Sequence, residues 1–346
     1  LEELEYADLL LHVIDASDPN REEHIAVVEK LISKLAKPET PVLRCYNKAD
    51  LVYPEDIPHG SDVVAISAKR GMNMEGLLKA IEKALPVVTV LTIPAAGSEA
   101  SGDTVITNEE KQLKYGYGSN HLRPLMSFMN PELFYTLPEN QVANGIADMM
   151  SHVFERYFTN TTHVELTDRL CEATLKTIMH NAQKLMENHE DYDAWCEIGF
   201  AGTVAHNGLV GCGRDQDWGC HNMEHELSAI YDVAHGAGLA VLTPGWMEYV
   251  YKDNVPMFVQ FAVNVMGVNG SYRDPDAIVM EGINRLREFF RKMGLPGTLA
   301  ELGIGEDRLE EMAKKCTGEA FGSEHPVGGL KKLYWQDVLN IYKLVK

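Results

Sequence analysis

Hydrophobic and polar positions follow two different patterns along this chain, and the change falls near Pro86. Before it, short apolar runs alternate with amphipathic stretches, which is typical of strands separated by helices. The pattern predicts strands at 7–14 (ADLLLHVI), 41–47 (PVLRCYN) and 62–67 (DVVAIS), and helices at 21–35 and 74–85. Strands separated by helices indicate a parallel sheet with helices on its faces. We therefore expect residues 1–86 to form an α/β half-domain with a partial parallel sheet.

After Pro86, helical periodicity dominates. An apolar strand is predicted at Val87–Ile93, and the small-residue segment 94–102 follows it. Apolar positions at helical spacing then predict helices at about 139–158, 163–189, 192–209, 221–231, 255–267, 275–293 and 333–345. We expect residues 87–346 to form a second, mostly α-helical domain.

The composition of the chain argues against nucleic-acid and membrane partners. Lys and Arg total 31 against 51 Asp and Glu, and the resulting net charge of −20 repels a phosphate backbone, so we expect no nucleic-acid partner. No apolar run approaches the roughly 20 residues of a membrane span, so no membrane partner is expected. The six cysteines include no C-x-x-C pair, which suits a reducing compartment and a cytoplasmic protein.

Two groups of metal-binding residue types stand out. Asp148 and His152 lie four residues apart in a helical pattern, so that both side chains share one helix face. His221, His225 and His235 fall within fifteen residues, near a predicted helix start and a His-Gly turn. The spacing alone leaves two interpretations open. The histidines could converge on a metal ion, or they could be buried residues that neighbouring carboxylates satisfy.

The sequence stretches around these residues resemble those of the iron-containing alcohol dehydrogenases, in particular the butanol dehydrogenase and broad-range aldehyde reductase branch. The matching stretches are ADMMSHVFERYFTN at 147–160 and HNMEHELSAIYDVAHGAGLAVLTPGWM at 221–247. The resemblance covers about residues 87–346. It implies Asp148, His152, His221 and His235 as metal ligands, and leaves His225 as an unligated catalytic histidine that could relay a proton.

The implied chemistry fits these residue types. One carboxylate and three imidazoles suit Fe²⁺, which the family implies, or Zn²⁺, with a position open for substrate. The ion would act as a Lewis acid while hydride passes between the substrate carbon and NAD(P). The family resemblance also extends to Ile93–Glu99 (IPAAGSE), which implies Thr92, Gly97 and Ser98 as cofactor contacts beside the nicotinamide.

Residues 1–86 carry different motifs. No glycine-rich pyrophosphate turn occurs before Val87, so we expect the family's dinucleotide-binding domain to be missing and NAD(P) binding to be impaired. The segment resembles instead the back half of an HflX-type GTPase domain. The N-K-x-D motif (Asn47, Lys48, Asp50) and the S-A-K motif (Ser67, Ala68, Lys69) each follow a predicted strand and imply a guanine-binding edge.

The expected function is therefore a metal-dependent alcohol dehydrogenase or aldehyde reductase that acts on a small primary alcohol or aldehyde. One alternative is a GTP-binding module, although no G-x-x-x-x-G-K-[ST] phosphate loop occurs and GTP should bind weakly. Another is a catalytically silent metal-binding fusion. A homo-oligomer is possible, because a partial sheet leaves an unpaired edge.

Overall fold

The structure is a computed structural model that describes residues 7–271 and 274–346. The first of its two units extends to Thr89 and also includes Gly118–Met126. Its sheet has the order β1-β2-β3 and is parallel throughout, with Leu10 opposite Val42 and Cys45 opposite Val64. The strands and helices of this unit are β1 (Leu10–Asp15), α1 (Arg21–Leu35), β2 (Val42–Asn47), β3 (Val63–Ala65) and α2 (Met74–Ala84).

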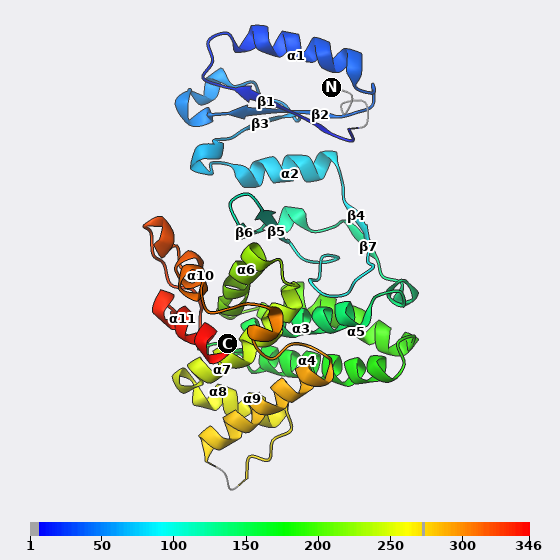
Figure 1. The fold of residues 1–346 in the computed structure, drawn as a ribbon. Coiled ribbons are helices and arrows are strands. Elements are labelled where there is room, and N and C mark those ends of the chain that lie inside the picture. The colour runs from blue at the N-terminus through cyan, green and yellow to red at the C-terminus, as the bar shows by residue number, and fades with distance from the viewer. Residues whose placement is uncertain (1–6, 272–273) are drawn as a thin grey trace. The chain divides into compact units, whose positions relative to one another are not determined.

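The two helices cover opposite faces of this sheet (Figure 1). Ile25 of α1 packs with Ile14 and Tyr46 on one face, and Leu77 of α2 packs with Leu43 and Val64 on the other. The predicted α/β arrangement of strands and helices is confirmed in this unit. Because side chains alternate along a strand, the apolar residues of β2 supply both faces, which explains its nearly continuous hydrophobic run.

The second unit comprises Val90–Tyr117 and Ser127–Lys346. Two short ribbons precede the helices along the chain. Strand β4 (Val88–Val90) pairs with β7 (Met126–Phe128), and both strands include residues on each side of the unit boundaries. Strand β5 (Asp103–Asn108) pairs with β6 (Leu113–Gly118). The helices that follow are α3 (Glu139–Tyr157), α4 (Glu165–Glu187), α5 (Tyr192–His206), α6 (Gly219–Tyr231), α7 (His235–Val250), α8 (Val255–Asn264), α9 (Pro275–Lys292), α10 (Leu309–Cys316) and α11 (Trp335–Leu344).

Helix α3 is the centre of the second unit. Nearly every residue from Val142 to Tyr157 is buried, and α3 contacts α4, α5, α6 and α7. The main hydrophobic core forms around it from residues such as Met149, Phe154 and Trp246. A polar side chain on α3 therefore faces protein rather than solvent, and burying it requires a partner.

Several elements differ from the sequence-based expectation. The β5–β6 hairpin was missed because most of its side chains are exposed on both faces, which removes the apolar alternation that marks a strand. Helix α10 was also missed. The His-Gly pair at 235–236 is not a turn but the start of α7, although Gly236, Gly238 and Pro244 all disfavour a helix. Burial along almost all of α7 outweighs that local preference.

Candidate metal centre and active-site cavity

Helix α3 supplies the first two residues of the candidate site. It starts after Pro138, whose extended backbone ends the preceding loop, and it continues without a break to Tyr157. Asp148 and His152, one turn apart on this helix, are each about 95% buried. The helical spacing read from the sequence thus places both side chains on an inward face.

Helices α6 and α7 supply the other two. His221 lies in the first turn of α6, after Trp218, which adopts a left-handed backbone with φ of 63°. His235 is the first residue of α7. The next residue, Gly236, sits so close to α3 that a Cβ atom there would lie 2.0 Å from the carbonyl oxygen of Asn144. This close crossing brings His235 to Asp148.

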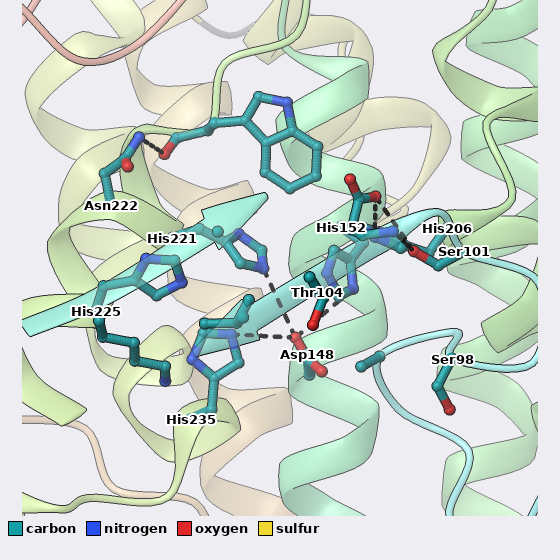
Figure 2. Close-up of a pocket in the computed structure, with 16 residues that line it drawn as sticks. Ser98, Ser101, Thr104, Asp148, His152, His206, His221, Asn222, His225 and His235 are labelled. Atoms are coloured by element: carbon teal, nitrogen blue, oxygen red, sulfur yellow. Dashed lines mark hydrogen bonds and ion pairs between the residues drawn. The ribbon is translucent and has the colours of Figure 1, made fainter. Parts of the chain in front are cut away.

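Three imidazole nitrogens converge on one carboxylate oxygen (Figure 2). Oδ1 of Asp148 lies 3.6 Å from Nδ1 of His152, 3.7 Å from Nε2 of His221 and 3.6 Å from Nε2 of His235. These distances are too long for hydrogen bonds, and the buried Asp148 Oδ1, His152 Nδ1 and His221 Nε2 have no hydrogen-bond partner.

A cation accounts for this geometry. Two ligands about 2.1 Å from a tetrahedral ion are separated by about 3.4 Å, close to the distances found here. The grouping of Asp148, His221 and His235 places one donor atom of each within 4.8 Å of the others. Neutral imidazoles and an ionised carboxylate are suitable donors for Fe²⁺ or Zn²⁺. The residues present therefore fit the metal that the sequence implied.

Two buried glutamates, which are not among the site residues predicted from the sequence, orient the histidines. Nδ1 of His221 donates a hydrogen bond to Glu155, and Nδ1 of His235 donates one to Glu224. Because a carboxylate can only accept, Nδ1 of each ring carries a proton, and the neutral form of each ring, which a metal would require, turns its Nε2 lone pair toward Asp148. The available signal was helical spacing, since Glu155 and Glu224 each follow a candidate histidine by three residues.

The electrostatics of the cluster favour a cation. Burial alone would raise the pKa of Asp148, but the surrounding imidazoles hold that pKa well below its ordinary value. Burial would lower the pKa of His221, yet Glu155 and Asp148 outweigh it and raise that pKa to about 10. Burial lowers the pKa of His152 well below its ordinary value. The carboxylates thus create a negative field where the nitrogens converge.

A cavity of about 530 Å³ opens onto this cluster. Figure 2 shows the side chains that surround it. Its lining comes from the loop after β4, the β5–β6 hairpin and helices α3, α5 and α6, with the start of α7. The lining residues are Ala96, Ser98, Ser101, Asp103, Thr104, Val105, Lys114, Gly116, Asp148, His152, His206, Trp218, His221, Asn222, His225 and His235.

His225 lines the cavity one helical turn after His221. Its ring centre lies 5.8 Å from that of His235, and donor atoms of Glu224, His225 and His235 also lie within 4.8 Å of one another. Burial, followed by the charges of His235 and Lys114, lowers the pKa of His225 to about 3. At neutral pH the ring is therefore uncharged, and it faces the space where substrate would lie.

The three proposed cofactor contacts have different positions. Ser98 lines the cavity, whereas Thr92 is exposed and lies outside this lining. Gly97 is buried with φ of 64°, and a Cβ there would lie 2.7 Å from Cβ of His206. A glycine is needed at this position both for its left-handed backbone and for its contact with α5.

The candidate guanine-binding residues lie together in the first unit, after β2 and β3. Oδ1 of Asn47 accepts hydrogen bonds from the backbone N–H groups of Lys48 and Ala68, at 2.8 and 3.0 Å, so it braces the two loops. Ser67 is buried and Lys69 is exposed in the second of these loops. Two charged groups already have partners: Lys48 is 2.6 Å from Asp15, and Asp50 is 2.7 Å from Arg70.

The chain is similar to known dehydrogenases. A sequence model described as the Fe-containing alcohol dehydrogenase family, C-terminal, matches residues 142–345, and a model of iron-containing alcohol dehydrogenase matches residues 62–131. NADH-dependent butanol dehydrogenase A of Clostridium acetobutylicum is 42% identical over 264 residues, covering 76% of this chain and 67% of that protein. The NADPH-dependent aldehyde reductase YqhD of Escherichia coli is 32% identical over 237 residues, covering 68% and 61% respectively.

Solved structures extend the likeness to both units. The crystal structure of NADH-dependent butanol dehydrogenase A from Thermotoga maritima matches with a TM-score of 0.72 and 29% identity, covering 97% of this chain and 90% of that one. E. coli YqhD matches in fold with a TM-score of 0.73 and 24% identity. Because these matches include the α/β unit, the expectation that the dinucleotide-binding domain is missing is not supported. The GTPase resemblance of residues 1–86 is not shown by these matches either.

Curated relatives such as the clostridial butanol dehydrogenase are longer, and the chain spans about two thirds of their length. Among the helices in the described part of the chain, none is long and apolar enough to cross a membrane.

Proposed function

The chain belongs to the Fe-containing alcohol dehydrogenase family, and from that premise we propose that it interconverts small primary alcohols and aldehydes with a bound divalent metal and NAD(P) as hydride carrier. The observation that carries this proposal is the convergence of buried, unpartnered donor atoms of Asp148, His152 and His221 at the inner end of a cavity. Burying three unpartnered polar atoms costs free energy, and coordination of a cation relieves that cost.

Asp148, His152, His221 and His235 would hold the metal. When bound there, it supplies Lewis-acid chemistry, which polarises a carbonyl and favours ionisation of an alcohol. Glu155 and Glu224 keep the Nε2 atoms of two of these histidines turned inward. The hydride itself comes from or returns to the nicotinamide, whose chemistry the protein only positions.

The remaining cavity residues have separable roles. Ser98 lines the cavity directly after the Gly97 turn, and this loop would contact the nicotinamide end of the cofactor. His225 lines the same cavity beside His235, and we assign it the relay of a proton between the reacting oxygen and solvent. Trp218 packs edge-on against the rings of His152 and His221 and lines the cavity beside them.

The test combines metal analysis with turnover. We expect the isolated chain loaded with Fe²⁺ or Zn²⁺ to retain about one ion and to oxidise NADH or NADPH when butanal is added. Asp148→Ala and His221→Ala should each lose the metal, because each removes a donor from a buried set. His225→Ala should keep the metal and lose most of its turnover.

His180→Ala is the matched control, since this histidine is exposed on α4 and lies outside the cavity. Unchanged metal content in Asp148→Ala and His221→Ala would contradict the ligand assignment. Metal loss in His225→Ala as great as in His221→Ala would move the ligand role to His225, as the neighbouring Glu224–His225–His235 grouping would allow.

A further inference from the structure

His206, the last residue of α5, lies between the candidate ligand His152 and the loop at Gly97. It is about 95% buried, and its ring centre lies 4.0 Å from that of His152 on α3 and 5.9 Å from that of Trp218. Its Cβ packs against Gly97 in the loop on the cofactor side. This residue is not among those predicted from the sequence.

Two hydrogen bonds determine the state and orientation of the His206 ring. Arg156 donates to Nδ1 at 3.2 Å, and since that nitrogen accepts, the proton of the neutral ring resides on Nε2. Nε2 then donates to Oδ2 of Asp103, 2.8 Å away. A carboxylate can only accept, so both bonds agree on one tautomer.

Arg156 connects this ring to the metal side of the site. It donates to the backbone carbonyl of His152 at 2.7 Å, and its guanidinium lies 4.6 Å above the Trp218 ring. One side chain thus binds both His206 and the helix turn that presents His152. A displacement of the His206 ring would therefore also displace the helix turn that carries His152.

Asp103 connects the same ring to the β5–β6 hairpin, which forms part of the cavity wall. It is the first residue of β5, and the β5–β6 hairpin contributes Thr104, Val105 and Lys114 to the cavity lining. The far end of this hairpin is attached to α10, where Lys315 donates to the carbonyl of Gln112 at 2.7 Å. The hairpin is therefore held at its tip by α10 and at its base by the Asp103–His206 bond.

We propose that His206 is a positioning residue, which fixes the cofactor-side loop and the base of the β5–β6 hairpin against the helix turn that carries His152. This inference rests on the proposed function, because hydride transfer depends steeply on the separation of the two reacting carbons. Both anchors of that separation, the Gly97 loop and the His152 turn, contact His206. The residue neither binds the metal nor exchanges a proton with substrate.

The central variant is His206→Phe, which keeps a ring against His152 and Gly97 but removes both hydrogen bonds. We expect kcat for butanal reduction to fall about 10- to 100-fold with little change in the KM for butanal and with metal content intact. The deuterium isotope effect measured with 4-deuterated cofactor should increase, because hydride transfer becomes more rate-limiting. His206→Gln can still donate to Asp103 and should recover part of the loss.

A readout independent of turnover is amide hydrogen exchange. In His206→Phe and in Asp103→Ala, the amides of β5 and β6 should exchange about tenfold faster, since one end of the hairpin is released. The double variant should be no worse than the more affected single variant, because the two residues act through one bond. His180→Phe serves as the matched control and should change none of these quantities.

The possible failures are distinguishable. If the unaltered chain binds no metal and turns over no butanal, the proposed function fails, whatever His206 does to hairpin exchange. If the unaltered chain is active and His206→Phe has normal kcat and normal exchange, the positioning role is wrong. Metal loss in His206→Phe, or fully additive losses in the double variant, would likewise overturn it, because His206 would then act as a ligand or independently of Asp103.

Discussion

At the scale of single residues, the candidate centre depends on which atoms lack partners. Buried polar side chains in proteins generally have hydrogen-bond partners. Asp148 Oδ1, His152 Nδ1 and His221 Nε2 are exceptions, and their lone pairs meet at one point. Of the two interpretations left open by the sequence, the structure shows the carboxylate contacts, and the bound metal stays a prediction. Neighbouring carboxylates do satisfy the outer nitrogens of His221 and His235, and this leaves the inner nitrogens for a cation.

Replacing an outer carboxylate tests that arrangement. Glu155→Gln should lower metal affinity by about 10- to 100-fold. A neutral amide in place of the carboxylate makes Nε2 of His221 a weaker metal ligand and no longer favours the tautomer with the proton on Nδ1. Competition against a chelator of known affinity measures the change. Glu165→Gln, an exposed change at the start of α4, is the control. Affinity that stays equal in the Glu155 variant and the control would show that the His221–Glu155 bond does not orient a ligand.

At the scale of elements, the site depends on how closely α7 crosses α3. Helix propensity argues against α7, yet its glycines are what allow the contact, since Gly236 lies against the backbone of Asn144. The same crossing sets the position of His235 relative to Asp148. The geometry of the candidate ligands therefore depends on the packing of α7 against α3.

Gly236→Ala should separate these two helices. The added methyl would lie 2.0 Å from a backbone oxygen, so α7 must move, at a cost of about 1–3 kcal/mol in unfolding free energy. Metal affinity should also fall, because His235 moves with the helix. Gly297→Ala is the control, since the nearest atom to its Cβ would be 4.0 Å away. Denaturant unfolding and chelator competition measure both effects. An unfolding free energy and a metal affinity equal to those of the unaltered chain would mean that α7 and α3 can cross with a methyl group at residue 236.

The turn before α6 depends on Asp217, a buried carboxylate that accepts backbone hydrogen bonds from Gly219, Gly329 and Leu330. Burial, together with repulsion from Glu155, raises its pKa from 3.8 to about 6. The folded chain holds this proton more tightly than the unfolded chain. The stability that this proton contributes is therefore fully present below pH 3.8 and is lost as the pH rises through about 6.

Urea unfolding can detect this titration. The unfolding free energy of the native chain relative to Asp217→Asn should decrease by about 1.4 kcal/mol between pH 5 and pH 7.5, because asparagine does not titrate. Comparing the two chains at each pH cancels the contributions of other groups. A difference that stays constant, or that grows with pH, would show that the Asp217 pKa is not raised in the folded state.

At the scale of the whole molecule, an α/β unit accompanies a helical unit that contains all the candidate metal ligands. The solved dehydrogenase structures match the chain across both units. Residues 1–86 nonetheless contain no glycine-rich turn of the kind that receives a pyrophosphate at a helix N-terminus. The comparisons do not support impaired cofactor binding, which stays only a prediction from the absence of this turn.

We expect NADH and NADPH to bind more weakly here than to the clostridial butanol dehydrogenase, because residues 1–86 contain no glycine-rich pyrophosphate turn. Each charge-assisted hydrogen bond lost from the pyrophosphate should weaken binding by about 10- to 100-fold. Quenching of reduced-cofactor fluorescence measures the affinity, and GTP serves as a competitor. Because Asp50 is already paired with Arg70, we expect GTP to bind weakly too. Cofactor affinity equal to that of the relative, or sub-micromolar GTP affinity, would contradict this account of residues 1–86.

The spacing of residues along the chain was enough to predict several secondary-structure elements and one pair of site residues. A carboxylate and an imidazole four residues apart must share a helix face, so Asp148 and His152 could be paired before any fold was known. The alternation of strands and helices before Pro86 likewise predicted the parallel sheet, because each element's apolar period is a property of its own residues.

Only the tertiary structure decided which distant groups meet. His235 reaches Asp148 because α7 crosses α3 at Gly236, and His206 reaches Asp103 because α5 ends beneath β5, about one hundred residues away in the chain. The β5–β6 hairpin has no periodic signal of its own and is held by Asp103 and Gln112. Periodicity describes which way a side chain faces within one element, whereas the packing of elements against each other determines what that side chain faces.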